Sequence, residues 1–385
     1  MSAQAGQPSA TTDRQVLVVG GGLAGLATAA FLHRNGLSPV VVTAGEAAVG
    51  DVVLWSPAVS LLAELDLGTD LLASTEPVRR WHLHRGETTE RLSSAHDGRW
   101  PFVATDRGRL RELLRTRLPT GGLRLSKTPR RLDPTDSGLR VEFDDGVSER
   151  FDVVVGADGV DSWVRRSRLD DGVRERGVMR WTLRADEELG TPGTVTELWG
   201  PDGTLTYGPL GSNRARLVTQ AVGGSDLGPD SDPEAVVERL ARSVDTADRP
   251  LDCGSLTELT VVGGRADRTV DSDRWAAGYT ALVGSAARSL PSGLSVGPSL
   301  AVEDAYVLAA ELTGEASTTA AMRRYAHRRR GRGRALDRLA STDALSGSDE
   351  GSEAVRADRA RRAALLRSFF ARRVPAVSAD VEEHL

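Results

Sequence analysis

The chain has 385 residues, of which 39% are hydrophobic and 27% are charged, and its net charge is only −5. This length suits two interlocked domains, the composition is typical of a globular protein, and so weak a net charge gives no overall field that would attract nucleic acid. A single cysteine, Cys253, excludes an internal disulfide and fits a reducing compartment.

The front of the chain gives no sign of export or of a membrane anchor. The first thirteen residues are polar and lack the apolar core of a secretory signal. The longest apolar run, residues 16–32, is interrupted by four glycines, so it fits a strand, a turn and a helix rather than a membrane span. We therefore expect a cytoplasmic protein with no membrane segment.

A βαβ unit is predicted directly after this polar start. Residues 15–19 are a β-branched run that ends in glycines, residues 23–35 have the pattern of a small-residue helix, and residues 39–43 form a second buried strand. The turn from Gly20 to Gly25 matches GxGxxG. Its first glycine permits a tight turn, its second lets the backbone approach a pyrophosphate, and its third lets helix and strand pack closely. The motif predicts a bound dinucleotide, although it does not separate FAD from NAD, and a purely structural turn is the alternative.

The next hundred or so residues continue with helices and strands. Residues 57–73 have helical apolar spacing, and a hairpin pattern lies near residues 81–92. Residues 106–118 predict an amphipathic helix, which two strand patterns follow.

The pattern then changes to alternating runs punctuated by Gly, Pro and Asn. From about residue 173 to 275 these runs predict an antiparallel sheet, with one helix at 233–244. A buried-strand pattern returns after Gly278 and is followed by a helix. Arginine-rich helices are expected near residues 319–340 and 354–373.

Two segments resemble FAD-contacting parts of the FAD-dependent flavoprotein monooxygenases of the aromatic-hydroxylase type (class A). Residues 151–165, FDVVVGADGVDSWVR, resemble a strand and turn of that family with an Asp-Gly pair, here Asp158-Gly159, that lies close to the FAD pyrophosphate. Residues 106–110, DRGRL, resemble the family's Arg-x-x-Leu helix start. The resemblance implies that Arg107 reaches the FAD phosphate or ribose.

A third segment, residues 279–305, resembles the last FAD-contacting segment of the family and ends in Glu303-Asp304-Ala305. Each segment alone is a weak signal, but their order and spacing over residues 15–345 are specific. The resemblance therefore covers most of the chain.

The resemblance predicts an α/β fold, in which a Rossmann-like FAD-binding domain carries an inserted antiparallel-sheet substrate domain and C-terminal helices. Within the insert, Trp181 and Trp199 are expected to pack in the sheet. The predicted boundaries are 14–75, 101–172 and 276–345 for the discontinuous FAD-binding domain, 76–100 and 173–275 for the substrate domain, and 346–385 for a C-terminal helical segment.

Two positions depart from the family pattern. The second strand usually ends in an acidic residue that binds the ribose hydroxyls, but this chain has Thr43 there, with Glu46 three residues later. The third segment usually reads Gly-Asp, whose Asp meets the ribityl chain, but here it reads Gly284-Ser285. Losing two charge-assisted hydrogen bonds would total about 3–6 kcal/mol, or roughly two to four orders of magnitude in FAD affinity. Further departures in the third segment are Arg288, Ser295 and Val296.

The resemblance implies FAD as the cofactor, NADH or NADPH as a transient co-substrate, and a small apolar or aromatic molecule as the substrate of an oxygen-dependent reaction. Such chemistry requires no catalytic His, Cys or Ser constellation, and the sequence shows none. The scattered histidines predict no metal site. The residues expected to bind the cofactor are Gly20, Gly22, Leu23, Ala24, Gly25, Thr43, Arg107, Asp158, Gly159, Gly284, Ser285 and Gly297.

Two other functions are compatible with the same residues. An FAD-dependent reductase on this scaffold would transfer hydride without oxygen, whereas a flavin-weak or inactive relative would act as a binding or regulatory protein. The monooxygenase is the leading hypothesis, and Thr43 and Ser285 are the features that keep the last one open. The arginine-rich residues 323–340 lack interleaved aromatic side chains and indicate a solvated helix face rather than nucleic-acid or membrane contact. The helix at 354–373 is expected to cap the protein or to pack on a second subunit, as in a homodimer.

Overall fold

The computed structural model of the chain describes residues 14–44, 50–73, 75–85, 88–94, 102–169, 172–185, 191–200, 203–209, 215–222, 231–232, 235–236, 259–272, 274–290, 296–314 and 317–340. Most of the helix expected at 233–244 and the whole C-terminal segment 346–385 lie outside the described residues. The same is true of Cys253, Glu46 and Ser295.

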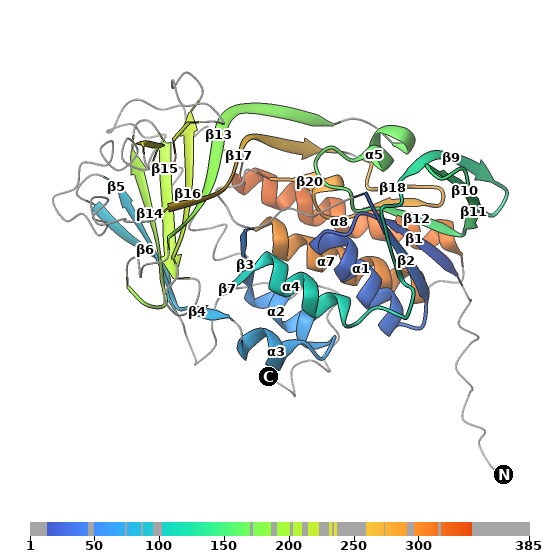
Figure 1. Cartoon of the computed structure of the whole chain (residues 1–385), viewed down its shortest axis with the longest axis horizontal. Coiled ribbons are helices and arrows are strands. Elements are labelled where there is room, and N and C mark those ends of the chain that lie inside the picture. Colours follow the sequence, from blue (N-terminus) through green and yellow to red (C-terminus); the bar gives the residue numbers. More distant parts are fainter. Residues whose placement is uncertain are drawn as a thin grey trace, which may run out of the picture.

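The molecule has two parts, and we call the one that contains the predicted βαβ unit the first part. A six-stranded sheet lies at its centre (Figure 1). Its order is β18-β19-β12-β1-β2-β8. Strand β1 runs parallel to both of its neighbours, and Val16, Leu17 and Val18 are fully buried, as expected for a strand covered on both faces. The strands are β1 (Gln15–Val19), β2 (Ser38–Thr43), β8 (Leu123–Leu125), β12 (Val153–Gly156), β18 (Ala276–Ala277) and β19 (Thr280–Leu282).

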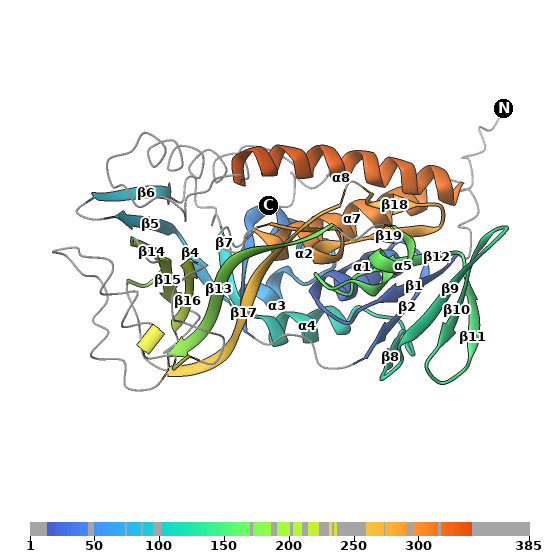
Figure 2. The same cartoon turned by 90° about the horizontal axis from the view of Figure 1, so that it is seen from above.

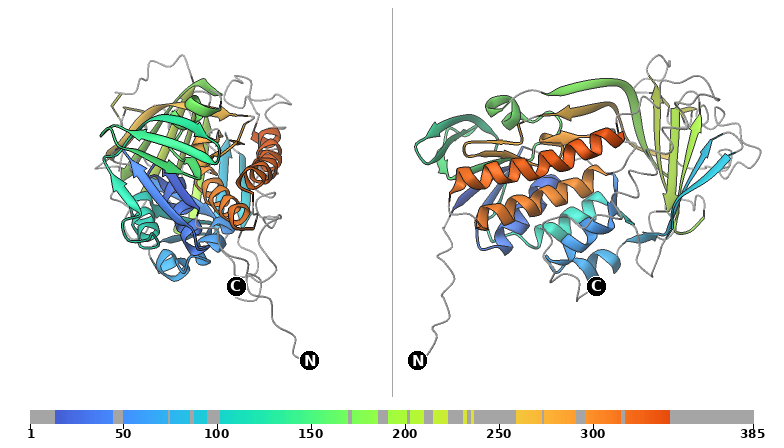
Figure 3. Two further views of the ribbon diagram at one scale, coloured as in Figure 1. Left: turned by 90° about the vertical axis from the view of Figure 1, so that its right-hand side faces the viewer. Right: turned by 180° about the vertical axis from the view of Figure 1, so that it is seen from behind.

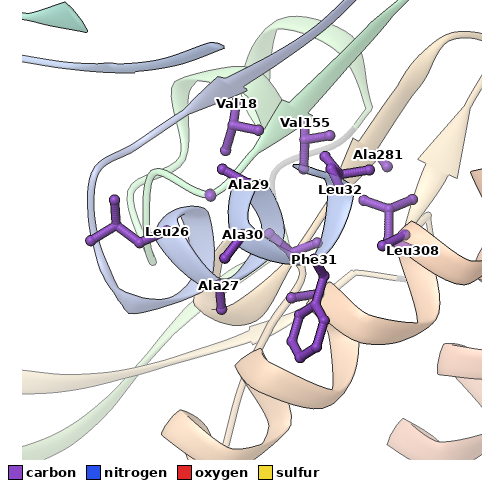
Figure 4. Packing of buried hydrophobic residues seen from close by; sticks show 14 of the residues in the cluster. Val18, Leu26, Ala27, Ala29, Ala30, Phe31, Leu32, Val155, Ala281 and Leu308 are labelled. Atoms are coloured by element: carbon purple, nitrogen blue, oxygen red, sulfur yellow. The ribbon is translucent and has the colours of Figure 1, made fainter. Parts of the chain in front are cut away.

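Helix α1 (Leu23–Arg34) packs between this sheet and helix α7 (Gly297–Gly314). Figure 4 shows the small side chains Ala27, Ala29 and Ala30 of α1 within this core, where they permit close approach of neighbouring elements. The ring of Phe31 lies edge-on to Tyr306 of α7, with the centroids 5.4 Å apart. The βαβ unit predicted from the sequence is therefore present and forms part of the main core.

Short helices and two small sheets complete this part. The predicted amphipathic helix is α4, which begins where Asp106 accepts a hydrogen bond of 2.9 Å from the backbone N–H of Arg109 and buries three leucines on one face. It ends at Arg115, three residues before the expected end. The elements are α2 (Ser56–Ala63), α3 (Gly68–Ala73), α4 (Arg107–Arg115), α5 (Trp163–Arg168), η2 (Gly284–Ala286), β3 (Asp51–Trp55), β4 (Glu76–Val78), β7 (Phe102–Asp106), β9 (Pro129–Thr135), β10 (Gly138–Phe143) and β11 (Ser148–Phe151).

An eight-stranded sheet lies at the other end of the molecule, in the order β20-β17-β13-β16-β15-β14-β5-β6 (Figure 1). Its neighbouring strands are antiparallel, as expected, except that β14 and β5 run parallel. The β5–β6 hairpin lies early in the chain, between β4 and β7 of the first part. Its strand β5 pairs with β14, which comes much later in the chain. The strands are β5 (Arg80–Arg85), β6 (Thr88–Ser94), β13 (Val173–Ala185), β14 (Thr194–Gly200), β15 (Gly203–Pro209), β16 (Ala215–Val222), β17 (Leu259–Asp271) and β20 (Arg288–Ser289).

The long helix α8 (Thr318–Ala340) lies beside α7 on one side of the first part of the molecule (Figures 2 and 3). The fully buried Tyr325 of α8 donates a hydrogen bond of 2.6 Å from its hydroxyl to the carbonyl oxygen of Leu282, at the end of β19. Trp275 packs against the same ring at 6.3 Å. Helix α8 is thus fastened to the end of a central strand. Within the described residues, no helix combines the length and apolar character needed to cross a membrane.

Replacing Tyr325 by Phe should lower the free energy of unfolding by about 1–3 kcal/mol, because a buried carbonyl oxygen loses this donor. Urea unfolding monitored by tryptophan fluorescence would measure the change. Tyr279→Phe is the matched control, since it removes a hydrogen bond of 3.0 Å from an exposed hydroxyl to the carbonyl oxygen of Asp136. Equal losses in the two variants would contradict the role given to the buried hydroxyl.

Candidate functional site

The turn between β1 and α1 is built on contacts that only glycine allows. Gly20 has a φ of +119°, and a Cβ atom there would lie 2.4 Å from the carbonyl oxygen of Ala157. A Cβ at Gly25 would lie 1.9 Å from the carbonyl oxygen of Gly20. The first and third glycines of the motif therefore serve close backbone packing, as the sequence predicts.

The middle glycine of the motif has a different environment. A Cβ at Gly22 would meet no atom within 4 Å, and this residue caps the N-terminus of α1 in an extended conformation. The first turn of α1, which begins at Leu23, contains no acidic residue. The helix N-terminus is therefore left open and electropositive, which is the arrangement that binds phosphate.

Two side chains from other elements border this turn. A Cβ at Gly21 would lie 3.0 Å from the Cβ of Thr43, so the end of β2 is next to the glycines, as predicted. Arg111 of α4 donates a hydrogen bond of 3.2 Å from Nε to the carbonyl oxygen of Gly21. Arg107, the predicted cofactor ligand, is half-buried one helical turn earlier, and its backbone N–H bonds to the carbonyl oxygen of Gly50 at 2.8 Å.

The Asp158-Gly159 pair lies in the loop between β12 and α5. The Asp158 carboxylate accepts hydrogen bonds from the backbone N–H groups of Trp163 and Val164, at 2.7 and 3.1 Å, and from the Ser162 hydroxyl. Burial raises the pKa of the Asp158 carboxyl, and these hydrogen bonds act in the opposite direction. Gly159 has a φ of +81°. Asp158 thus holds its own loop in shape, beside the glycine turn that touches Ala157.

The third predicted segment meets the first at Gly284. This residue has a φ of +59°, and a Cβ there would lie 2.7 Å from the Cβ of Ala24 in α1. Its backbone N–H donates a hydrogen bond of 2.8 Å to the Asp304 carboxylate. The neighbouring Ser285 is exposed. The structure therefore brings together two motifs that are about 260 residues apart in the sequence.

The buried Arg165 joins the second and third segments. Its guanidinium donates hydrogen bonds of 2.8 Å to the carbonyl oxygen of Ala286 and 2.6 Å to that of Val160. Arg165 therefore has a structural role. Gly297, at the start of α7, is exposed, and a Cβ there would meet no atom within 4 Å. It leaves room for a ligand at a second helix N-terminus.

A buried ion network behind the third segment corrects one expectation. The guanidinium of Arg329 bonds to Asp304 at 2.5 Å and to Glu303 at 3.1 Å, and Arg332 bonds to Glu303 at 3.0 Å. Only 3% of Arg329 is exposed, so the arginine-rich helix is not simply a solvated face. Burial raises the pKa of the Asp304 carboxyl, and the charge of Arg329 opposes that rise. The network fixes the carboxylate that holds Gly284.

Aromatic and acidic side chains gather where the eight-stranded sheet approaches α7. The backbone N–H of Trp55 donates a hydrogen bond of 3.0 Å to the hydroxyl of Ser299 in α7, and its ring lies 6.5 Å from that of Trp81. The Trp81 indole N–H donates to the Glu197 carboxylate at 3.2 Å. Glu197 is only 1% exposed. Trp181 is buried in the sheet as expected, while the side chain of Trp199 lies outside what the structure describes.

Comparisons with known proteins agree with this geometry. Residues 13–340 match the family described as FAD binding domain. The chain belongs to the FAD-dependent flavoprotein monooxygenases.

A 3-amino-4-hydroxybenzoate 2-monooxygenase of Streptomyces platensis is 30% identical to this flavoprotein over 335 residues, which cover 81% of this chain and 83% of that protein. An aurachin C monooxygenase/isomerase of Stigmatella aurantiaca is 28% identical over 82% of this chain and 84% of that protein. The structure of Klebsiella pneumoniae HpxO complexed with FAD and uric acid has a TM-score of 0.76 at 21% identity, over 94% of this chain and 97% of that chain. This last likeness shows a shared fold.

The described residues of the flavoprotein fit FAD. The open positions at Gly22 and Gly297 lie at the N-termini of α1 and α7, and Gly284 lies against both helices, next to Ala24 of α1 and Ala301 of α7. No group of three His, Cys, Asp or Glu in the described part of the chain is placed to hold a metal ion. Sequence reasoning missed Arg111, Glu197 and the contacts of Arg329. A signal existed only for Arg111, which lies four residues after Arg107 and thus on the same helix face.

Gly22→Ala and Gly25→Ala should separate cofactor binding from folding. The methyl group at residue 22 enters open space, so the flavin-free variant should keep its stability within about 1 kcal/mol, the scale of a helix-cap change, while FAD binding is lost. The methyl group at residue 25 clashes with backbone and should cost about 1–3 kcal/mol or more. Urea unfolding of the flavin-free proteins and an FAD titration would test both. Tight FAD binding by Gly22→Ala would rule out the phosphate position given to this turn.

Arg329→Met should lower the free energy of unfolding by about 3–5 kcal/mol, because two buried carboxylates lose their shared counter-charge. Removing that charge also raises the pKa of Asp304 further in the folded variant, but not in the unfolded chain. The folded variant therefore binds a proton at a higher pH than the unfolded chain does. Its stability should therefore rise as the pH falls from 7 toward the ordinary Asp range.

Arg115→Met is the control for this prediction, because Arg115 pairs with Glu112 at 3.0 Å and both side chains are exposed. Its loss should be within about 1 kcal/mol. Urea unfolding at several pH values measures both variants, and an Arg329→Met protein as stable as the control would exclude the network.

Proposed function

We propose that the chain is a monooxygenase that uses NADH or NADPH and dioxygen to oxidise a small aromatic or apolar molecule at bound FAD, in the cytoplasm. The single observation that supports this proposal best is the open glycine turn at Gly22, joined through Ala24 to Gly284 of the third segment. When bound, FAD supplies the redox chemistry, and the protein binds and orients the reactants.

The proposed cofactor contacts come from several elements. The N-terminus of α1, with Gly20, Gly22 and Gly25, receives the pyrophosphate, and Thr43 lies on the ribose side. Arg107, Asp158 and Gly159 border the same ligand. Gly284, Ser285 and Gly297 line the side where the flavin lies. Backbone N–H groups dominate this set, and they bind phosphate without a large desolvation cost.

The eight-stranded sheet, apart from β20 at its edge, lies within the predicted boundaries 76–100 and 173–275 and is proposed to form the substrate domain. Trp55 and Trp81 are fully buried where this sheet meets the N-terminal part of α7, so they fix the sheet against that helix, and the buried Glu197 orients the Trp81 indole. The activity of the Streptomyces platensis relative, on 3-amino-4-hydroxybenzoate, supports an aromatic substrate.

The first test is whether the purified protein is yellow and whether added FAD raises its melting temperature. At 100-fold excess over Kd, FAD should stabilise the folded state by about 2.7 kcal/mol. If the protein is colourless and FAD does not stabilise it, both the monooxygenase and the reductase hypotheses are excluded. The remaining hypothesis is then a binding or regulatory protein.

The second measurement follows NAD(P)H oxidation and oxygen uptake with a panel of small aromatic acids and phenols. Substrate-stimulated oxygen uptake with an oxygenated product is the expected outcome. Substrate reduction at the expense of NAD(P)H without oxygen uptake would instead identify a reductase. Size-exclusion chromatography with light scattering tests the homodimer expected from the sequence.

A further inference from the structure

Arg111 lies on α4 and reaches the phosphate-binding turn. Its Nε–H bonds to the carbonyl oxygen of Gly21 at 3.2 Å, which leaves the four N–H donors of the two Nη atoms for other partners. The side chain is half-buried. Arg111 therefore presents a cation beside the open N-terminus of α1.

No carboxylate of the described residues neutralises the charge of Arg111. Among the residues that the structure describes, no carboxylate lies within ion-pair distance of Arg111, whereas Arg115 on the next turn pairs with Glu112 at 3.0 Å. The carbonyl of Gly21 satisfies one donor only. A guanidinium held against a backbone carbonyl, with its remaining donors unpaired, is suited to an anionic ligand.

Thr43 and Arg111 border the same residue of the turn. A Cβ at Gly21 would lie 3.0–3.2 Å from the Thr43 side chain, and Arg111 binds the Gly21 carbonyl. Where the family pattern places an acid, this corner has a neutral hydroxyl and a cation. An acid at position 43 without the arginine would give a local charge of about −1, whereas the neutral hydroxyl together with Arg111 gives about +1. Such a corner attracts phosphate more strongly than it attracts a ribose hydroxyl.

We propose that Arg111 binds a phosphate group of the adenine nucleotide seated on the glycine turn, and so offsets the carboxylate missing at Thr43. The proposal rests on the function proposed above. The phosphate has two sources: the pyrophosphate of FAD, or the 2′-phosphate of an NADP-type nucleotide that occupies the same turn. Both are anions that a guanidinium can bind with two parallel hydrogen bonds.

The experiment uses the full chain freed of flavin and four proteins: wild type, Arg111→Gln, Arg111→Lys and the control Arg109→Gln. Arg109 is exposed on the same helix, so the control removes the same charge away from the turn. FAD binding is measured by flavin fluorescence at low and high salt. Displacement of a fluorescent adenine nucleotide by 2′,5′-ADP and by 5′-ADP measures the preference for a 2′-phosphate.

If the FAD pyrophosphate is the source, Arg111→Gln should weaken FAD about ten- to a hundredfold and reduce the salt dependence, while Arg109→Gln changes the Kd by less than about threefold. Arg111→Lys should retain most of the affinity because it keeps the charge. If the 2′-phosphate is the source, wild type should prefer 2′,5′-ADP to 5′-ADP, and Arg111→Gln should lose that preference with little change in FAD affinity.

Equal behaviour of Arg111→Gln and Arg109→Gln in both assays would overturn the proposal. So would an Arg111→Lys protein as weak as Arg111→Gln, since the effect would then belong to the Gly21 contact alone. A wild-type protein that binds no FAD would instead count against the proposed function, and the displacement assay would still decide the role of Arg111. Melting temperatures of the flavin-free variants show whether each one is folded.

Discussion

The close approach of backbone to backbone at the start of α1 is the constraint on which the rest of the structure depends. Gly25 lies against the carbonyl of Gly20, and Gly20 lies against that of Ala157. No side chain fits in either place, so α1, β1 and the end of β12 come together at contact distance. The same helix carries Ala24, which touches Gly284 from the far end of the chain. Phosphate-binding geometry and core packing are therefore one property of this turn.

Buried hydrogen bonds and ion pairs hold Gly284 in its position against α1. The Asp304 carboxylate accepts a hydrogen bond from the N–H of Gly284, and the positive charge of Arg329 offsets the free-energy cost of burying this carboxylate. A buried ion pair is weak evidence for stability, but breaking one is costly, so the arrangement fixes conformation more than it adds free energy. Arg165 acts similarly on the other side, where it ties the loop after Asp158 to Ala286. Three sequence segments are thus fixed relative to one another by buried arginines and carboxylates.

The local parts of this structure could be predicted from the sequence, and the long-range parts could not. The glycine turn is recognisable because a positive φ and a missing Cβ are requirements of single residues at fixed spacing. The partnership of Arg329 with Asp304 depends on how two helices pack, and arginines on a helix are usually solvated, so the expected exposed face was partly wrong. The buried-strand pattern after Gly278 is present as β19, shortly before Gly284, but the sequence carries no signal for the contact of Gly284 with Ala24. The parallel pairing of β14 with β5 has no sequence signal, because it joins segments more than a hundred residues apart.

The distance along the chain between Ala24 and Gly284 has a consequence for synthesis on the ribosome. The residues that surround the glycine turn emerge first, but the partner that closes on α1 emerges about 260 residues later, followed by the helix that supplies Arg329. Domains fold as units while the chain is made, so a nascent chain keeps the surface around Ala24 uncovered until the segment with Gly284 has been made. Nucleotide binding is therefore acquired late, and an interrupted chain has the motif without the site.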